Sequence, residues 1–246
     1  MQRYKFELSY NGTSYFGWQR QPRQISVQEE IEKAISKLFD GHLFSVVGCG
    51  RTDTGVHAKY YVLHVDLPLK WESEILKYKL NRILPNSISI FSITETIENF
   101  HARFSAKART YRYFVHTEKD SFLYDRSLYL NKKLNVEAMN QAAVYLLGKQ
   151  DFTSFSKLHT DVFTNICTVT SAIWIEYEKG NFYFEITADR FLRNMVRATV
   201  GTLLEIGLGK ITVEDLLQII AKKDRCEAKT SVPAHALFLW DVKYSN

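Results

Sequence analysis

The side chains best suited to chemistry lie in residues 48–58, which read GCGRTDTGVHA. Asp53 stands between two threonines, and Arg51 precedes it by two residues. The pKa of an aspartate in water is about 3.9, so this side chain is a carboxylate at neutral pH. A carboxylate on a glycine-containing loop beside an arginine can act as a nucleophile or as a base. The structural alternative is a turn aspartate that hydrogen-bonds its own backbone.

The triplet Asp-Thr-Gly at residues 53–55 also occurs in aspartic proteases. That chemistry needs two carboxylates that share a proton. This chain contains a single Asp-Thr-Gly, so a homodimer would have to supply the second carboxylate. A dimeric aspartic hydrolase is therefore an alternative function.

Motifs for cofactors and metals are missing from the sequence. The glycines near Asp53 lack the spacing of a dinucleotide-binding fingerprint, and no Gly-Lys-Ser or Gly-Lys-Thr occurs. The seven histidines form no His-x-x-x-His pair, and the three cysteines form no Cys-x-x-Cys pair. We therefore expect an enzyme without a nucleotide cofactor or a metal.

Two further segments carry clustered cations. Residues 100–113 interleave four cations with four aromatic side chains, which can meet phosphate and base together, although an ordinary amphipathic strand has the same pattern. Arg190, Arg193 and Arg197 have the spacing of one stripe on a helix. Such a stripe either contacts carboxylates and phosphates or forms an exposed charged face.

The periodicity of apolar residues predicts how these segments are positioned. Alternation predicts strands, and a 3.6-residue repeat with capping residues predicts helices. In the first half we expect strands at 3–10, 44–47, 60–65 and 87–93, and helices at 26–39 and 72–80. In the second half we expect strands at 110–116, 172–177, 182–188 and 237–244, and helices at 136–147, 192–205 and 212–221.

These elements predict an α+β fold with mostly antiparallel sheets whose helices cover one face. We place the domain boundary in the basic polar stretch that follows Phe104. The N-terminal half, residues 1–105, then carries the aspartate loop. The C-terminal half, residues 106–246, carries the tyrosine strand and the arginine helix.

The overall composition suits a protein with an anionic partner. The net charge is +5, and fourteen Tyr and sixteen Phe supply flat faces on which bases can stack. Three widely separated cysteines predict a reducing, cytoplasmic setting. The N-terminus lacks the apolar run of a signal peptide, and no stretch is apolar enough for a membrane span.

In chain order, these segments resemble the tRNA pseudouridine synthase A family. Residues 50–58 resemble its signature G-R-T-D-x-G-V-H-A, and residues 10–12 with 15–19 resemble its opening strand and loop. Residues 100–106, followed by two tyrosines, resemble its central motif, and residues 191–201 resemble its late helix. One departure is Ala236, where the family usually has glycine.

The resemblance implies two pseudo-symmetric α/β halves of RRM-like or ferredoxin-like topology, with sheets that meet around a basic cleft. It also implies a homodimer that binds tRNA and isomerises uridines at positions 38, 39 and 40 of the anticodon stem-loop, without a cofactor. A catalytically silent RNA-binding protein of the same fold is the remaining alternative.

The resemblance also implies roles for individual residues. Asp53 would attack C6 of the uracil or C1′ of the ribose, or stabilise the detached base, after the base has left its stack. Tyr111 would pack on that base and take the C5 proton, and Arg197 would pair with Asp53. The residues expected to contact RNA are Arg51, His57, Arg103, Arg109, Tyr111 and Arg193.

Overall fold

The computed structural model describes residues 1–157 and 163–245, which form two compact units. Unit 1 contains Met1–Lys107 and Phe238–Asn246, and unit 2 contains Ala108–Leu237. The first division lies two residues beyond the boundary expected from the sequence. The end of the chain differs from that expectation, because its last strand belongs to unit 1 rather than to the C-terminal half.

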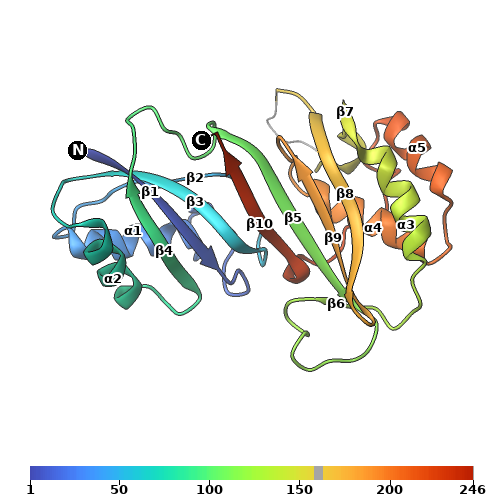
Figure 1. Ribbon diagram of the computed structural model, residues 1–246, viewed down its shortest axis with the longest axis horizontal. Helices are drawn as coiled ribbons and strands as arrows, with labels where there is room; N and C mark the ends of the chain where they lie inside the picture. The colour runs from blue at the N-terminus through green and yellow to red at the C-terminus, as the bar shows by residue number, and fades with distance from the viewer. Residues whose placement is uncertain (158–162, 246) are drawn as a thin grey trace. The chain divides into compact units, whose positions relative to one another are not determined.

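Unit 1 is a sheet with two helices (Figure 1). Its antiparallel strands lie in the order β4-β1-β3, and the short β2 pairs with β3. The chain order β1, α1, β2, β3, α2, β4 is that of a ferredoxin-like fold. The bounds are β1 Gln2–Tyr10, α1 Val27–Leu38, β2 Val47–Gly48, β3 His57–Leu67, α2 Ser73–Ile83 and β4 Ile88–Glu95.

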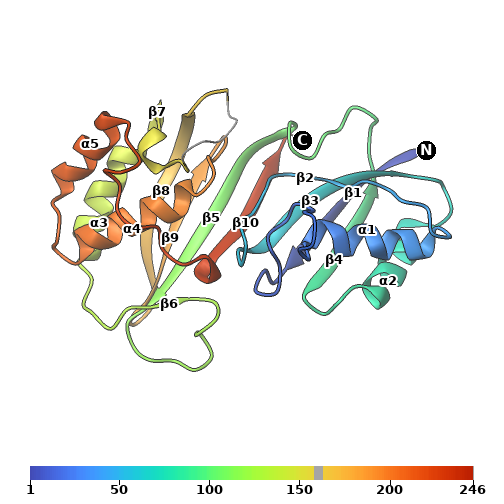
Figure 2. The same cartoon turned by 180° about the vertical axis from the view of Figure 1, so that it is seen from behind.

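Alternation along β1 produces one buried face. Tyr4, Phe6, Leu8 and Tyr10 are each at most 4% exposed, as expected for a half-buried strand. Helices α1 and α2 contact each other and cover one face of this sheet (Figure 2). The strand predicted at residues 3–10 and the helices predicted at 26–39 and 72–80 are therefore confirmed, apart from small shifts at their ends.

The strand expected at residues 44–47 is largely absent, since β2 contains only Val47 and Gly48. The backbone N–H of Val46 donates to the carboxylate of Glu32 at 3.1 Å. A donor that is bonded to a side chain is not available for a strand ladder. The contact between α1 and this segment therefore limits β2 to two residues.

The last strand, β10 (Leu237–Tyr244), pairs with β3 in parallel. Phe238 lies opposite His57, and Leu239 lies opposite Ala58. The strand itself was predicted from its apolar alternation, whereas its partner strand depends on a contact between distant parts of the chain. This pairing is the reason why the C-terminus belongs to unit 1.

The strands of unit 2 lie in the order β5-β9-β8-β7, and the short β6 pairs with β5 in parallel. Helix α3 contacts α4, α5 and β8. The chain order β5, α3, β8, β9, α4 and the sheet order β5-β9-β8 repeat the first five elements of unit 1. The bounds are β5 Ala106–His116, β6 Leu128–Tyr129, α3 Val136–Ala143, β7 Gly148–Asp151, β8 Ile166–Glu178, β9 Asn181–Ala188, α4 Met195–Gly207 and α5 Val213–Lys222.

Helix α4 begins three residues later than the sequence predicted. Its N-cap, Asn194, has a φ of 67°, in the left-handed region, so the helix cannot extend backwards through it. Arg190 and Arg193 consequently lie in the preceding loop, and Arg197 is the one member of the predicted stripe on the helix. The prediction of a single helical stripe is wrong.

Both units are mixtures of helix and mostly antiparallel sheet, which confirms the predicted α+β class. Across the two described stretches of the chain, none of the helices combines the length and apolarity needed to cross a membrane.

Candidate active site

Asp53 lies in a loop, residues 49–56, between β2 and β3. The backbone N–H of Cys49 donates to the carbonyl of Val62 at 2.8 Å, and that of Val56 donates to the carbonyl of Asp53 at 3.1 Å. Asp53 is half-buried and Arg51 is exposed. The loop position predicted from the sequence is therefore confirmed. The sheet holds the start of the loop at Cys49, and the hydrogen bond between Val56 and Asp53 closes a turn that contains the aspartate.

A second loop, residues 11–18, lies directly against this one. The N–H of Trp18 donates to the carbonyl of Thr52, and the N–H of Gly55 donates to the carbonyl of Tyr15, both at 3.2 Å. At this contact the two main chains leave no space for an additional side chain.

Two glycines make this approach possible. A Cβ atom on Gly12 would lie 2.0 Å from the carbonyl oxygen of Val56, and one on Gly17 would lie 2.4 Å from that of Thr52. Gly17 also has a φ of +92°, which other residues rarely adopt. The glycines of the opening motif therefore fix the distance between the two loops.

Buried aromatic side chains support the same loop from the sheet. The hydroxyl of Tyr10 is 2.8 Å from Oγ1 of Thr52, and that of Tyr61 donates to the carbonyl of Gly50 at 2.5 Å. The ring of Trp18 stacks on that of Tyr61, with centroids 4.1 Å apart. Two of these three residues, Tyr10 and Trp18, belong to the opening motif of the family, but no supporting role was predicted for them.

His57 is 1% exposed, and this differs from the expectation that it contacts RNA. Its Nδ1 accepts the backbone N–H of Gly12 at 3.0 Å, and its ring stacks on Phe238 with centroids 4.5 Å apart. An imidazole buried in this way has no surface to offer RNA. It instead links the 11–18 loop, the 49–56 loop and β10.

The loop that carries Arg103 is organised by two histidines. Nδ1 of His101 accepts the N–H groups of Arg103 and Phe104, each at 3.2 Å, and Nδ1 of His64 accepts the N–H of Ala102 at 3.1 Å. Burial, together with the nearby positive charge of Arg3, lowers the pKa of His64 to about 4. His64 is therefore neutral at pH 7, as an acceptor at Nδ1 requires.

This loop displays a cation beside an exposed ring. Phe104 is 75% exposed and stacks on His101, with centroids 4.3 Å apart. The guanidinium of Arg103 lies 5.7 Å from the centre of the Phe104 ring. Exposed cations next to flat rings suit a nucleic-acid strand, and the contact of Arg103 with RNA stays a prediction.

In unit 2, the structure brings Arg109 and Tyr111 of β5 to the loop before α4. Nη1 of Arg109 donates to the carbonyl of Asp189 at 2.8 Å. The ring of Tyr111 meets that of Phe191 edge to face, with centroids 5.0 Å apart. Arg193 of the same loop is exposed, and its carbonyl accepts the N–H of Lys157 at 2.9 Å.

Arg197 lies in the first turn of α4 and is held by the segment that leads to β10. Its Nε donates to the carbonyl of Val232 at 2.7 Å, and its carbonyl accepts the N–H of Val232 at 3.2 Å. One turn later, a Cβ on Gly201 would lie 2.0 Å from the carbonyl oxygen of Thr230. Glycine at this position therefore lets the segment approach the helix closely enough to orient the guanidinium.

Ala236, the departure from the family pattern, is fully buried in a short 3-10 helix, Ala234–Ala236. It does not belong to the described residues that adopt a positive φ without being glycine. The backbone here is therefore one that alanine adopts without strain.

Among residues 1–157 and 163–245, no group of three or more His, Cys, Asp or Glu side chains is placed to hold a metal ion.

Comparison with known proteins gives a family match. A model described as tRNA pseudouridine synthase matches residues 8–105 and 142–245, which include Asp53 and Arg197. This chain belongs to the tRNA pseudouridine synthase family. Residues 106–141, with Arg109 and Tyr111, lie between the two matched segments.

Full-length relatives agree with this family. The chain is 50% identical to tRNA pseudouridine synthase A of Bacteroides thetaiotaomicron over 99% of its own length and 91% of that protein. It is 49% identical to the protein of the same name from Parabacteroides distasonis, covering 99% and 96% of the two chains. For the Bacillus subtilis protein the identity is 41%, with coverages of 99% and 100%. The enzyme is therefore an isomerase that converts uridine to pseudouridine in tRNA.

The loop contact of this enzyme predicts different effects for two glycine substitutions. Gly12→Ala places a methyl group against the backbone of Val56, so we expect a loss of about 1–3 kcal/mol in the free energy of unfolding, together with a loss of turnover. Gly50→Ala places a methyl group in open space and should leave that free energy within about 0.5 kcal/mol of the wild type. Urea unfolding of both variants tests this, and equal midpoints would contradict the close-contact argument.

Proposed function

We propose that this enzyme forms pseudouridine at positions 38, 39 and 40 of the tRNA anticodon stem-loop, with Asp53 as the nucleophile. The observation that carries the proposal is the signature around Asp53, on a loop whose backbone is held by the 11–18 loop. The positions within tRNA follow from the resemblance to the pseudouridine synthase A family.

The reaction exchanges one bond to the ribose for another. The bond between C1′ and N1 breaks, the base turns, and a bond between C1′ and C5 forms. The proton on C5 leaves, and N1 gains a proton, so substrate and product are isomers and no oxidant is required. The base must leave its stack before a side chain can reach it.

We assign the steps to residues of both units. The carboxylate of Asp53 attacks C6 of the uracil or C1′ of the ribose. Tyr111 packs on the flipped base and takes the proton from C5, while Arg197 keeps Asp53 ionised. Arg51, exposed on the catalytic loop, fills the space left by the base or binds phosphate. Contacts to the remaining backbone come from exposed or half-buried cations of the two units, namely Arg103, Arg109 and Arg193.

Two further properties belong to the proposal. The enzyme acts in the cytoplasm, since its three cysteines are free thiols that suit a reducing compartment. It acts as a homodimer, because a net charge of +5 is small for a protein that binds a folded tRNA, and two chains double it.

Mapping of the product tests the proposed site. Unmodified tRNA is incubated with the enzyme, and pseudouridine is located by carbodiimide labelling. Asp53→Asn should lower turnover by more than about a thousandfold, since it keeps the shape of the side chain but removes the charge. Its affinity for tRNA should stay within about twofold of the wild type, since phosphate contacts dominate that affinity. Label outside positions 38–40 would refute the proposed positions, and an active Asn variant would remove Asp53 from its role.

For Arg197 the informative substitution is lysine. Lysine keeps the charge but cannot form the planar two-pronged contact that a guanidinium offers a carboxylate. We expect Arg197→Lys to lower kcat by at least about tenfold, because the catalytic carboxylate loses an oriented partner. Steady-state kinetics on the mapped tRNA measures this. A Lys variant with the kcat of the wild type would show that only the charge matters.

The oligomeric state is tested without substrate. Light scattering at micromolar concentration should give about twice the chain mass of 28.6 kDa. The affinity for tRNA should also fall steeply with salt, since each neutralised phosphate releases counterions. A monomer that modifies tRNA at the full rate would rule out the two-chain arrangement.

A further inference from the structure

The loop at residues 16–25 adjoins the catalytic loop, but none of its side chains has so far been assigned a contact with RNA. It closes on itself, since the N–H of Phe16 donates to the carbonyl of Ile25 at 2.9 Å. Near its start, Trp18 donates to the carbonyl of Thr52, next to Asp53 in the chain. Arg20 follows two residues later, which corresponds to roughly 7 Å of chain. The main chain of Arg20 therefore lies within roughly 7 Å of a residue that contacts the catalytic loop.

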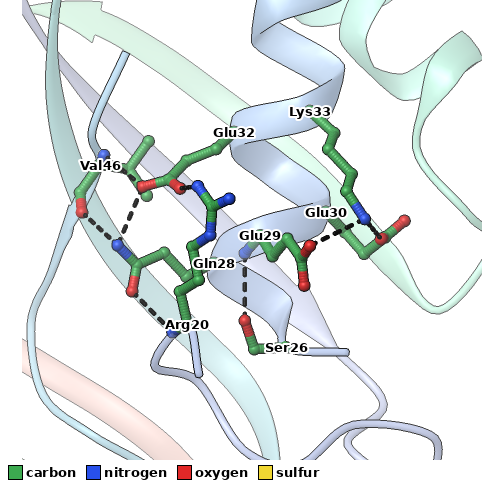
Figure 3. Close-up of polar contacts among 8 residues, drawn as sticks. All are labelled: Arg20, Ser26, Gln28, Glu29, Glu30, Glu32, Lys33 and Val46. Carbon is green, nitrogen blue, oxygen red and sulfur yellow. Dashed lines mark hydrogen bonds and ion pairs between the residues drawn. The ribbon is translucent and has the colours of Figure 1, made fainter. Parts of the chain in front are cut away.

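Two side chains of α1 hold Arg20 in place (Figure 3). Oε1 of Gln28 accepts the backbone N–H of Arg20 at 3.1 Å. Oε2 of Glu32 lies 3.5 Å from Nη1 of the Arg20 guanidinium. Main chain and side chain are thus both fixed by one face of the helix.

Glu32 is a buried carboxylate, with a side chain that is 8% exposed. Its Oε1 accepts the N–H of Val46 at 3.1 Å and the amide of Gln28 at 2.9 Å. A buried charge is unfavourable unless donors and an opposite charge surround it. Here the two hydrogen-bond donors come from Gln28 and Val46, and the opposite charge comes from Arg20 in the exposed loop.

The guanidinium of Arg20 keeps most of its donors available. Its side chain is 57% exposed. In the part of the chain that the structure describes, its polar side-chain contact is the single one from Nη1 to Glu32. A guanidinium carries five N–H donors in a rigid fork, which suits two-pronged binding of phosphate.

We propose that Arg20 binds a phosphate of the tRNA backbone beside the catalytic loop, and that Glu32 is a positioning residue that orients it. This inference rests on the proposed role of the Asp53 loop. It gives a function to the buried carboxylate and to the closed loop, which the isomerisation steps leave without one.

Lys33, on the same helix, provides a matched control. Its side chain is 55% exposed, close to that of Arg20, but it contacts two carboxylates, Glu29 at 3.0 Å and Glu30 at 3.4 Å. Figure 3 shows Lys33 directed toward these two glutamates, apart from the contacts of Arg20. Removal of either cation changes the net charge equally, so a difference between the variants reports position rather than charge.

The first test measures tRNA binding and turnover of the full-length enzyme at several salt concentrations. Arg20→Ala should raise the Kd for tRNA about tenfold and reduce the slope of log K against log salt by about 1, as for a lost phosphate contact. Its KM should rise with the Kd, while kcat stays within about twofold, because the lost contact binds substrate and transition state alike. Lys33→Ala should match the wild type in all of these values. Equal binding by the two variants would overturn the proposal.

The second test asks whether Glu32 acts through Arg20. Glu32→Gln keeps an oxygen acceptor for Val46 but removes the charge that orients the guanidinium, so the Kd should rise about threefold. In the Arg20→Ala background, the same change should have no further effect on binding, because coupled residues are not additive. Additive effects would show that Glu32 supports the fold independently, which would overturn its positioning role.

These readouts separate the inference from the proposed active site. Binding measures Arg20, whereas turnover by Asp53→Asn measures the nucleophile. If Arg20→Ala left the Kd for tRNA unchanged while Asp53→Asn remained inactive, only the phosphate contact would be refuted. An active Asn variant with the Arg20 effect intact would refute only the proposed nucleophile.

Discussion

The structure of the site depends on one contact, in which the main chains of residues 11–18 and 49–56 lie directly against each other. Gly12 and Gly17 have no room for a Cβ atom at this contact, and backbone hydrogen bonds join the loops on both sides of Asp53. The proposed role of Asp53 as nucleophile needs a carboxylate in a fixed position, because small displacements of a reacting group lower the rate strongly. The close contact restrains the backbone of the loop and leaves the side chain of Asp53 half-buried.

The sheet of unit 1 brings these loops together. Antiparallel pairing of β1 with β3 sets Tyr10 opposite Ala58, so the loop that follows β1 and the loop that precedes β3 share one end of the sheet. Strand β10 then adds Phe238 beside His57, whose imidazole accepts the N–H of Gly12. The C-terminus of the chain thereby stabilises a loop contact near its N-terminus.

For the attraction of RNA phosphate, the positions of the cations matter more than their total number. Several are matched closely by acids, as Arg3 is by Asp66 and Lys33 is by two glutamates. Others, such as Arg51 and Arg103, are exposed on loops next to the candidate site or to an exposed ring. A net charge of +5 can therefore serve an RNA-binding enzyme, because local placement determines where phosphate is attracted.

The sequence by itself determined most of the helices and strands and the position of the loop that carries Asp53, because capping, apolar period and turn residues act within a few positions of one another. The cap of α1 at Ser26, the alternation of β1 and the loop around Asp53 were all predicted in this way. Only the tertiary structure decided that β10 joins β3, that His57 is buried, and that α4 begins after Arg193. Strand partners and burial depend on contacts between residues far apart in the chain. A residue with a left-handed backbone before a helix does not change the spacing of the apolar residues, so the apolar period does not reveal where the helix begins.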